Sequence, residues 1–321
     1  MSTISTKNEL LTVSSFNCRG LGIDTKLKTV IDWLKTNHNG IILLQETHTT
    51  VNDEDKFKKL WGNEIIFNHG TSSRCGIAIL LPFKLSYKIK DIVSDNKGRF
   101  LLLNIAIDEN EYVIINIYAP TKDKINDQIE FLKYVELKIA NYRGNNIIMG
   151  GDFNVCLNNN IDKDGGKVEK ASTYNKNLHD FIEDYRLVDI WRQRNKNKKL
   201  FTWRSKTKSG VVQSRLDMFL VSENLQYIIP NVCIKTGLKS DHSLINFSIK
   251  LLNTIKRGLG SWKMNLELLK DKEYVNEVKN KIKYLSENTK LNDQNTFWDY
   301  IKCEIRSISI QASNKYRSYI E

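Results

Sequence analysis

The sequence predicts an α/β fold in which two packed, mixed β-sheets are covered by outer helices. Apolar runs of strand length alternate with amphipathic helical segments as far as about residue 252, and the strand-like runs are the more numerous. The runs FLLLNIAI and YVIINIY flank the short polar connection DENE, which indicates an antiparallel hairpin and therefore a mixed sheet. Two sheets with helices outside them accommodate this number of strands.

The individual elements follow from local patterns along the chain. A strand over 11–17 precedes a helix over 24–38, which begins at Asp24 and places four aliphatic residues on one face. The segment KTKSGVVQ, between the runs FTWRS and RLDMFLV, predicts a hairpin with a lysine-rich tip. The remaining strands are expected at 41–47, 76–81, 100–107, 112–118, 146–150, 201–205, 215–221 and 243–249, and the remaining helices at 127–143 and 171–186.

The pattern changes after residue 252. The glycine-punctuated connector NTIKRGLGSWKMN is followed by helical spacing over 265–285 and 295–310, without a strand signal. We therefore expect one α/β domain over residues 1–252 and a helical appendage over residues 253–321.

Composition limits the class of protein. A chain of 321 residues with 40% hydrophobic residues can bury a full core, and 49 Lys and Arg against 37 Asp and Glu give a net charge of +12. That balance suits a polyanion such as nucleic acid, although solvated surface charge explains it equally well. The five widely spaced cysteines include no CxxC pair, and neither a signal segment nor a long apolar run occurs, which indicates the nucleus or cytoplasm and no membrane.

Polar residues recur where predicted strands end or begin. In NIIMGGDFN two glycines are expected to let the strand end bend, so that the acid and the amide emerge together. A single polar residue at such a place is more often a turn or capping residue than a functional one. Asp217, inside the apolar run RLDMFLV, is an exception, because a buried carboxylate is costly unless it has a partner. The set consists of Asn17, Glu46, Tyr118, Asp152, Asn154, Asp217, Asp241 and His242.

Metal-assisted phosphodiester hydrolysis is the chemistry that uses such a set. Glu46 and Asn17 would offer oxygen ligands to Mg²⁺, and Asp152 or Asp217 would orient and deprotonate the attacking water. Three donors suit the charge on the pentacoordinate phosphorus, namely Asn154, Tyr118 and His242. Asp241 would hold the adjacent imidazole in one tautomer.

Six motifs in order carry a family resemblance. FNCRGL, LLQET, INIYAP, GGDFN, SRLDMFLVS and SDHSLI resemble the motif series of the magnesium-dependent endonuclease, exonuclease and phosphatase superfamily, over residues 10 to 250. The resemblance implies a four-layered α/β sandwich. Within the superfamily the chain looks most like the amino-terminal endonuclease domain of LINE-type (non-LTR) retrotransposon proteins, and its tail resembles the segment that joins this domain to a reverse transcriptase.

The resemblance also implies roles. Glu46 and Asn17 would ligate Mg²⁺, with Mn²⁺ as an alternative ion, and Asp152 would position the water with support from Asn154 and Asp217. Tyr118 and His242, the latter oriented by Asp241, would contact the scissile phosphate. The resemblance implies contacts with DNA from Thr202 and from the hairpin loop that contains Lys206 and Lys208. Arg74, from its place before GIAILL, could also face the phosphate cleft. His48, His69 and His179 have no motif partner and are interpreted as surface or packing residues.

We expect the chain to act as a monomer that nicks double-stranded DNA and leaves a 3′-hydroxyl. The RNA of the element is a possible second binding partner. Two alternatives remain open from sequence. One is an apurinic/apyrimidinic repair endonuclease of the same fold, and the other is a decayed or domesticated domain that binds nucleic acid without cleaving it.

Overall fold

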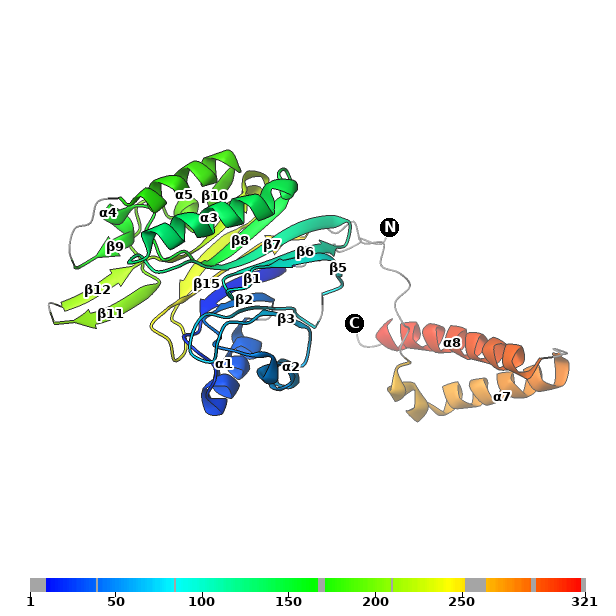
Figure 1. The fold of residues 1–321 in the computed structure, drawn as a ribbon. Helices are drawn as coiled ribbons and strands as arrows, with labels where there is room; N and C mark the ends of the chain where they lie inside the picture. The colour runs from blue at the N-terminus through cyan, green and yellow to red at the C-terminus, as the bar shows by residue number, and fades with distance from the viewer. Residues whose placement is uncertain are drawn as a thin grey trace. The chain divides into compact units, whose positions relative to one another are not determined.

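A computed structural model describes residues 10–38, 40–83, 85–166, 171–208, 210–251, 264–289 and 293–318. The chain forms two compact units, Met1–Ile255 and Lys256–Glu321, and each is considered by itself. The first unit contains two six-stranded sheets, a smaller three-stranded sheet and the helices that cover them (Figure 1).

The two large sheets are both mixed, as predicted. The first has the order β14 (Asn231–Lys235), β15 (Leu244–Lys250), β1 (Leu10–Asn17), β2 (Ile41–Gln45), β4 (Ile77–Leu80) and β3 (Ile65–Asn68). The second has the order β10 (Leu187–Asp189), β13 (Asp217–Ser222), β8 (Asn146–Asp152), β7 (Asn110–Tyr118), β6 (Phe100–Ile107) and β5 (Lys88–Ser94). The small sheet pairs β11 (Trp203–Thr207) with β12 (Gly210–Ser214), and β12 with β9 (Lys163–Asp164).

The layers follow from the alternation of side chains along the strands. In β7, Ile114 packs between the two sheets, whereas Val113 and Ile115 pack against helices on the outer face. The helices α3 (Ile125–Ile139) and α5 (Thr173–Asp184) cover the second sheet, and α1 (Asp24–Asn37) and α2 (Glu54–Trp61) cover the first. The predicted four-layered sandwich is therefore confirmed. The remaining short helices of this unit are η1 (Val51–Asp53), η2 (Ala140–Tyr142), α4 (Asn159–Asp162), α6 (Ile190–Arg194) and η3 (Glu223–Ile228).

The two sheets are also joined by a buried polar contact. Gln45 Nε2 donates to Asn116 Oδ1 at 2.7 Å, and Asn116 Nδ2 donates to the carbonyls of Leu44 and Ala78, each at 2.9 Å. Because buried amides must be satisfied, this contact favours one alignment of the sheets. It lies two residues before Tyr118, so it helps to fix the edge at which the polar strand ends meet.

Some elements escaped the sequence patterns. The strands β5 and β14 lie at sheet edges and contain no buried residue, so neither forms the continuous apolar run by which the other strands were predicted. The expected bend at Gly150 and Gly151 is wrong, because β8 runs on through Asp152. These glycines instead allow close approach: a Cβ on Gly151 would lie 1.9 Å from the Ile117 carbonyl oxygen, and one on Gly150 would lie 2.2 Å from the Phe219 ring.

The second unit contains η4 (Leu266–Lys270), α7 (Lys272–Asn288) and α8 (Gln294–Ser318). The helices are joined by a 2.7 Å hydrogen bond between the hydroxyls of Tyr274 and Ser309 and by a 2.9 Å ion pair between Lys281 and Glu304. None of the helices in the described ranges combines the length and apolar character needed to cross a membrane.

Candidate active site

Strand pairing brings the polar strand ends to one edge of the sandwich. The strands β1 and β2 run parallel and both end at this edge, as do β7 and β8, whose Tyr118 and Asp152 are directly paired. The strand β13 runs antiparallel to β8 and begins there, with Asp217 opposite Asp152. A cavity of about 990 Å³ opens at this edge and is lined by Glu46, Tyr118, Asp152, Asn154, Asp241 and His242, among others.

Asn17 links two of the carboxylates. Its side-chain nitrogen donates to Glu46 Oε1 at 2.9 Å and to Asp152 Oδ2 at 3.0 Å, and its oxygen accepts from the Arg19 amide at 3.1 Å. If the Asn17 side-chain amide were rotated by 180°, its oxygen would face the two carboxylates and its NH₂ group would face the Arg19 N–H, and both contacts would be repulsive. Asn17 therefore holds the acids as a donor, and this orientation differs from the expected oxygen ligand.

Glu46 is held in its ionised form. Burial opposes ionisation, but hydrogen bonds from His48, Asn17 and Tyr118 outweigh it and lower the pKa of Glu46 to about 2. The backbone of Glu46 lies in the left-handed region, with φ of 50°. A side chain of this kind, charged and facing the cavity, is a suitable oxygen ligand for a hard divalent cation.

Asp152, Asp217 and His242 form a buried triad. His242 Nδ1 lies 2.8 Å from Asp217 Oδ2, and His242 Nε2 lies 3.9 Å from Asp152 Oδ2. Burial and the neighbouring Asp217 raise the pKa of Asp152, while the pKa of His242 is raised because the two carboxylates outweigh the effect of burial. The ligand atoms of the three side chains lie within 4.8 Å of one another, so this triad is a second place that a metal ion could occupy.

Asp241 does not hold the imidazole, so that expectation is corrected. Its carboxylate oxygen Oδ2 accepts from Trp203 Nε1 at 3.2 Å and lies 3.3 Å from Arg19 Nη1. The imidazole of His242 bonds instead to Asp217. Asp241 and His242 are adjacent in the segment before β15, but their side chains point in different directions, and only that of His242 is directed into the interior. Asp217 thereby finds the partner that its burial required.

Tyr118 and Asn154 lie beside the acids. The Tyr118 hydroxyl bonds to Glu46, and burial together with the Glu46 and Asp152 charges raises the pKa of the phenol. Arg99 stacks over the Tyr118 ring at 4.8 Å from its centroid. Asn154, at φ of 51°, donates from its side chain to the Ala119 carbonyl at 2.8 Å, and its amide donates to Asp152 Oδ1 at 2.9 Å.

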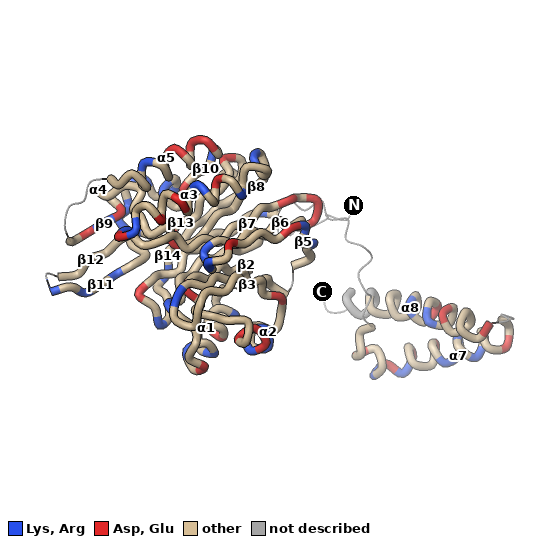
Figure 2. Tube along the Cα trace, in the orientation of Figure 1, with Lys and Arg blue, Asp and Glu red and all other residues tan. Residues whose placement is uncertain are grey.

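The expected DNA contacts have different environments. Thr202 is fully buried, and its hydroxyl accepts from the amides of Leu216 and Asp217 at 3.0 Å each, so it positions the start of β13 and cannot touch DNA. Lys206 and Lys208 are exposed on the β11–β12 hairpin, whose basic residues are visible in Figure 2. Arg74 is exposed and is absent from the described residues that line the cavity.

Two residues near the acids were missed from the sequence. His48 Nε2 lies 3.5 Å from Glu46 Oε2, so this histidine has a motif partner that the sequence did not indicate, whereas His69 pairs with Glu54 away from the cavity lining. Arg19 lines the cavity. Arg19 lies within FNCRGL, two residues after Asn17, and His48 directly follows LLQET, two residues after Glu46. The chain forms irregular turns at both places, so no periodic pattern indicated either residue.

The sequence matches the model of the Endonuclease/Exonuclease/phosphatase family over residues 14–242. The chain belongs to this family. It is accordingly an enzyme of the hydrolase class, as expected from its motifs.

Individual relatives agree with the expected resemblance. The chain is 26% identical over 270 residues to the Transposon TX1 uncharacterized 149 kDa protein of Xenopus laevis, a match that covers 84% of this chain and 20% of the relative's length. The AP endonuclease LMAP from Leishmania major superposes with a TM-score of 0.62 at 17% identity, covering 75% of this chain and 88% of the other. An AP endonuclease from Archaeoglobus fulgidus superposes with a TM-score of 0.60 at 20% identity, covering 75% of this chain and 100% of the other. The expected similarity of this chain to a transposon protein in sequence, and to apurinic endonucleases in fold, is thus confirmed.

Proposed function

We propose that the chain nicks double-stranded DNA by magnesium-dependent attack of water on a phosphodiester and leaves a 3′-hydroxyl, as in target-primed reverse transcription by a LINE-type element. The observation that carries the proposal is the convergence of Glu46, Asp152 and His242 on one wall of a cavity, with Asp217 bonded to His242. The β11–β12 hairpin, which carries Lys206 and Lys208, also contributes to the lining. The transposon relative supports the biological setting. In that setting, residues 253–321 would join the nuclease to a reverse transcriptase in the nucleus or cytoplasm.

The carboxylates fit a hard divalent cation. Glu46 is ionised and faces the cavity, and Asp152 lies close by, since both accept from the same Asn17 nitrogen. Glu46 and Asp152 would therefore hold Mg²⁺, which Mn²⁺ could replace. The bound ion would neutralise charge on the phosphate during hydrolysis.

Three side chains would accept a proton from the attacking water or donate hydrogen bonds to the phosphate. Asp152 belongs to the buried triad and would position the attacking water and accept its proton. His242 is held as a cation by Asp217, so its Nε2–H would donate to a phosphate oxygen. The Tyr118 hydroxyl would act as a second donor at the same phosphate.

A second candidate function has one observation in its favour. Both superposed structures are AP endonucleases, and the cavity is large enough to admit an abasic sugar beside the acids. An apurinic/apyrimidinic repair endonuclease would use the same carboxylates and histidine. The two functions therefore differ in the DNA that is cut rather than in the chemistry.

The test is nicking of supercoiled plasmid with Mg²⁺ by the wild-type chain, Glu46→Ala and His242→Ala. We expect open circles from the wild type alone, on undamaged plasmid, with cut ends that a polymerase can extend, and complete loss of nicking with a chelator. Glu54→Ala is the matched control, because Glu54 is a histidine-paired glutamate that is absent from the described cavity lining. It should nick as the wild type does.

The other outcomes identify the alternatives. Nicking confined to plasmid that carries abasic sites would support the repair endonuclease. Folded protein that binds DNA without cutting it, with affinity that falls with salt but not with a chelator, would support a binding domain and overturn the proposal.

A further inference from the structure

Arg19 has a well-defined backbone and a side chain that reaches the cavity. Its φ of 49° lies in the left-handed region, its amide donates to Asn17 Oδ1, and its carbonyl accepts from Lys26 Nζ at 2.8 Å. The next residue, Gly20, donates to the Glu46 carbonyl at 2.6 Å. These contacts place the base of the side chain directly beside the carboxylates.

The guanidinium is aimed by Asp241. Arg19 Nη1 lies 3.3 Å from Asp241 Oδ2, and the same oxygen accepts from Trp203 Nε1 at 3.2 Å. The Asp241 carbonyl also accepts from the Arg204 amide at 3.2 Å, so the acid is tied to β11. An ion pair between two mobile surface side chains contributes little to stability. Asp241 is instead held in place by its other hydrogen bonds, so its contact with Arg19 fixes the direction of the guanidinium.

The cavity lining combines carboxylates with cationic side chains. Glu46, Asp123 and Asp152 repel a phosphodiester, whereas Lys122 and Lys163 attract it, and Arg19 is the one arginine among the described residues of the lining. The Arg19 side chain remains 63% exposed despite its contact with Asp241. A guanidinium has five N–H donors in a planar fork that matches two phosphate oxygens, so one contact with Asp241 leaves the fork able to bind phosphate.

We propose that Arg19 binds a backbone phosphate of the DNA strand in the cavity and that Asp241 positions Arg19 for this contact rather than orienting His242. The inference rests on the proposed function, since it assigns a substrate contact in the same cavity. It gives Asp241 a role that its observed partners support. It also adds an arginine to the cavity residues that would bind the substrate.

The experiment measures binding of a fluorescent DNA duplex in EDTA as salt is varied, so that cleavage plays no part. Arg19→Gln should raise Kd about tenfold at low salt and lower the slope of log Kd against log salt by about one, as expected for one lost phosphate contact. Arg19→Lys should keep the slope and still raise Kd several-fold, because an ammonium cannot make two parallel hydrogen bonds.

Arg186→Gln is the matched control. Arg186 is also exposed and also has φ of 49°, but it precedes β10 at the opposite end of the second sheet from Asp217. Its substitution should leave Kd and the slope unchanged. Asp241→Asn should weaken binding in the wild-type background and have little further effect beside Arg19→Gln, because a positioning residue acts through its partner.

Different failures have different meanings. Wild-type nicking together with unchanged Kd and slope in Arg19→Gln would overturn the inference and leave the proposed function intact. Fully additive effects of Asp241→Asn and Arg19→Gln would overturn the positioning role. A folded wild-type chain that neither binds nor nicks DNA would overturn both the inference and the function on which it rests.

Discussion

At the scale of single residues, the position of Glu46 depends on a cluster of unusual backbone conformations. Glu46 and His48 both have positive φ, at 50° and 53°, which costs about 1–3 kcal/mol each in a non-glycine residue. Gly20 provides the space, since a Cβ there would lie 2.7 Å from His48 Nδ1. The imidazole is thus packed over Gly20 and directed at the Glu46 carboxylate.

This packing predicts a metal-binding phenotype for His48→Ala. Without the ring, the Glu46 carboxylate loses a hydrogen-bonding partner that orients it, and we expect Mg²⁺ or Mn²⁺ affinity to fall about tenfold by calorimetry. His69→Ala is the control, because His69 pairs with Glu54 outside the described cavity lining. Equal metal affinity in the wild type and His48→Ala would refute the role.

His38 predicts a pH dependence of stability. Burial and, to a lesser extent, Lys235 lower its pKa from 6.5 to about 4, so the native state binds fewer protons than the unfolded state between these values. Stability contributed by neutral His38 is therefore complete above pH 6.5 and is lost as pH falls toward 4, by up to about 3 kcal/mol.

Urea unfolding of His38→Gln at several pH values checks this expectation. The variant should lose less stability than the wild type between pH 6.5 and 4, because its amide does not titrate. Parallel pH profiles for the two chains would show that His38 does not contribute.

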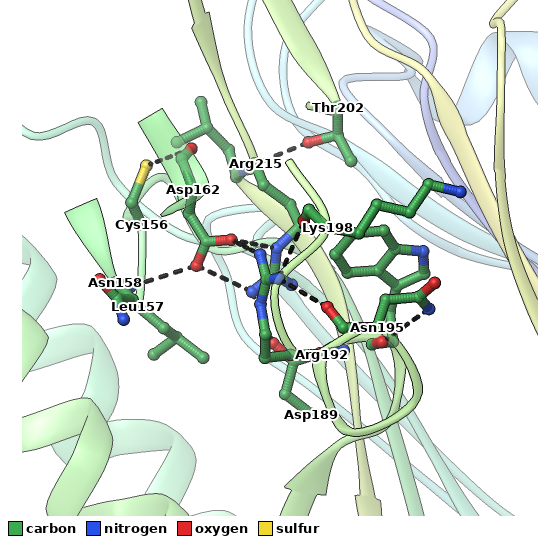
Figure 3. A network of polar contacts seen from close by, with 12 residues as sticks. Cys156, Leu157, Asn158, Asp162, Asp189, Arg192, Asn195, Lys198, Thr202 and Arg215 are labelled. Atoms are coloured by element: carbon green, nitrogen blue, oxygen red, sulfur yellow. Dashed lines mark hydrogen bonds and ion pairs between the residues drawn. The ribbon is translucent and has the colours of Figure 1, made fainter. Parts of the chain in front are cut away.

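At the scale of elements, a buried ionic cluster joins the segments behind the active site (Figure 3). Asp162, at the end of α4, accepts from Arg215 Nε at 2.7 Å and Arg215 Nη2 at 2.9 Å, and it also pairs with Arg192 from α6. Arg215 reaches Asp189 at 2.7 Å as well. Since Arg215 is fully buried and lies two residues before Asp217, the cluster fixes the start of β13.

Removing one member of this cluster should be costly. We expect Arg215→Met to lower the free energy of unfolding by about 3–5 kcal/mol in urea, because it leaves Asp162 charged and buried with too few partners. Adding Asp162→Asn should recover part of that loss. Arg194→Met, an exposed arginine that donates to backbone carbonyls, should cost about 1 kcal/mol or less. A small, equal effect of both arginine substitutions would contradict this view of the cluster.

At the scale of the whole molecule, the chain separates into two units with their own packed interiors. The second unit buries Leu268, Tyr274, Leu285 and Ile301, while large side chains such as Trp298 and Leu266 remain exposed. The residues proposed to act in catalysis all belong to the first unit.

A chain that ends at Ile255 should therefore unfold cooperatively and keep the plasmid-nicking rate of the full chain to within about twofold. Circular dichroism melting and the plasmid assay check the two parts of this expectation. Loss of cooperative melting on truncation would show that residues 256–321 are part of the nuclease core, and would also contradict the expected boundary near residue 252.

The sequence by itself determined the sandwich and most of the residues at its polar edge. The periodicity of a strand is a local property of the sequence, so the strands could be predicted from it. An acid within an apolar run, such as Asp217, also stands out in the sequence, so its burial could be predicted as well. The edge strands β5 and β14 were not predicted, because they contain no buried residue and form no continuous apolar run. Only the tertiary structure decided which side chains meet: it paired His242 with Asp217, Asp241 with Arg19 and His48 with Glu46, and it buried Thr202. These pairings depend on side-chain directions in irregular turns between distant strands, and neighbouring residues in the sequence do not specify those directions.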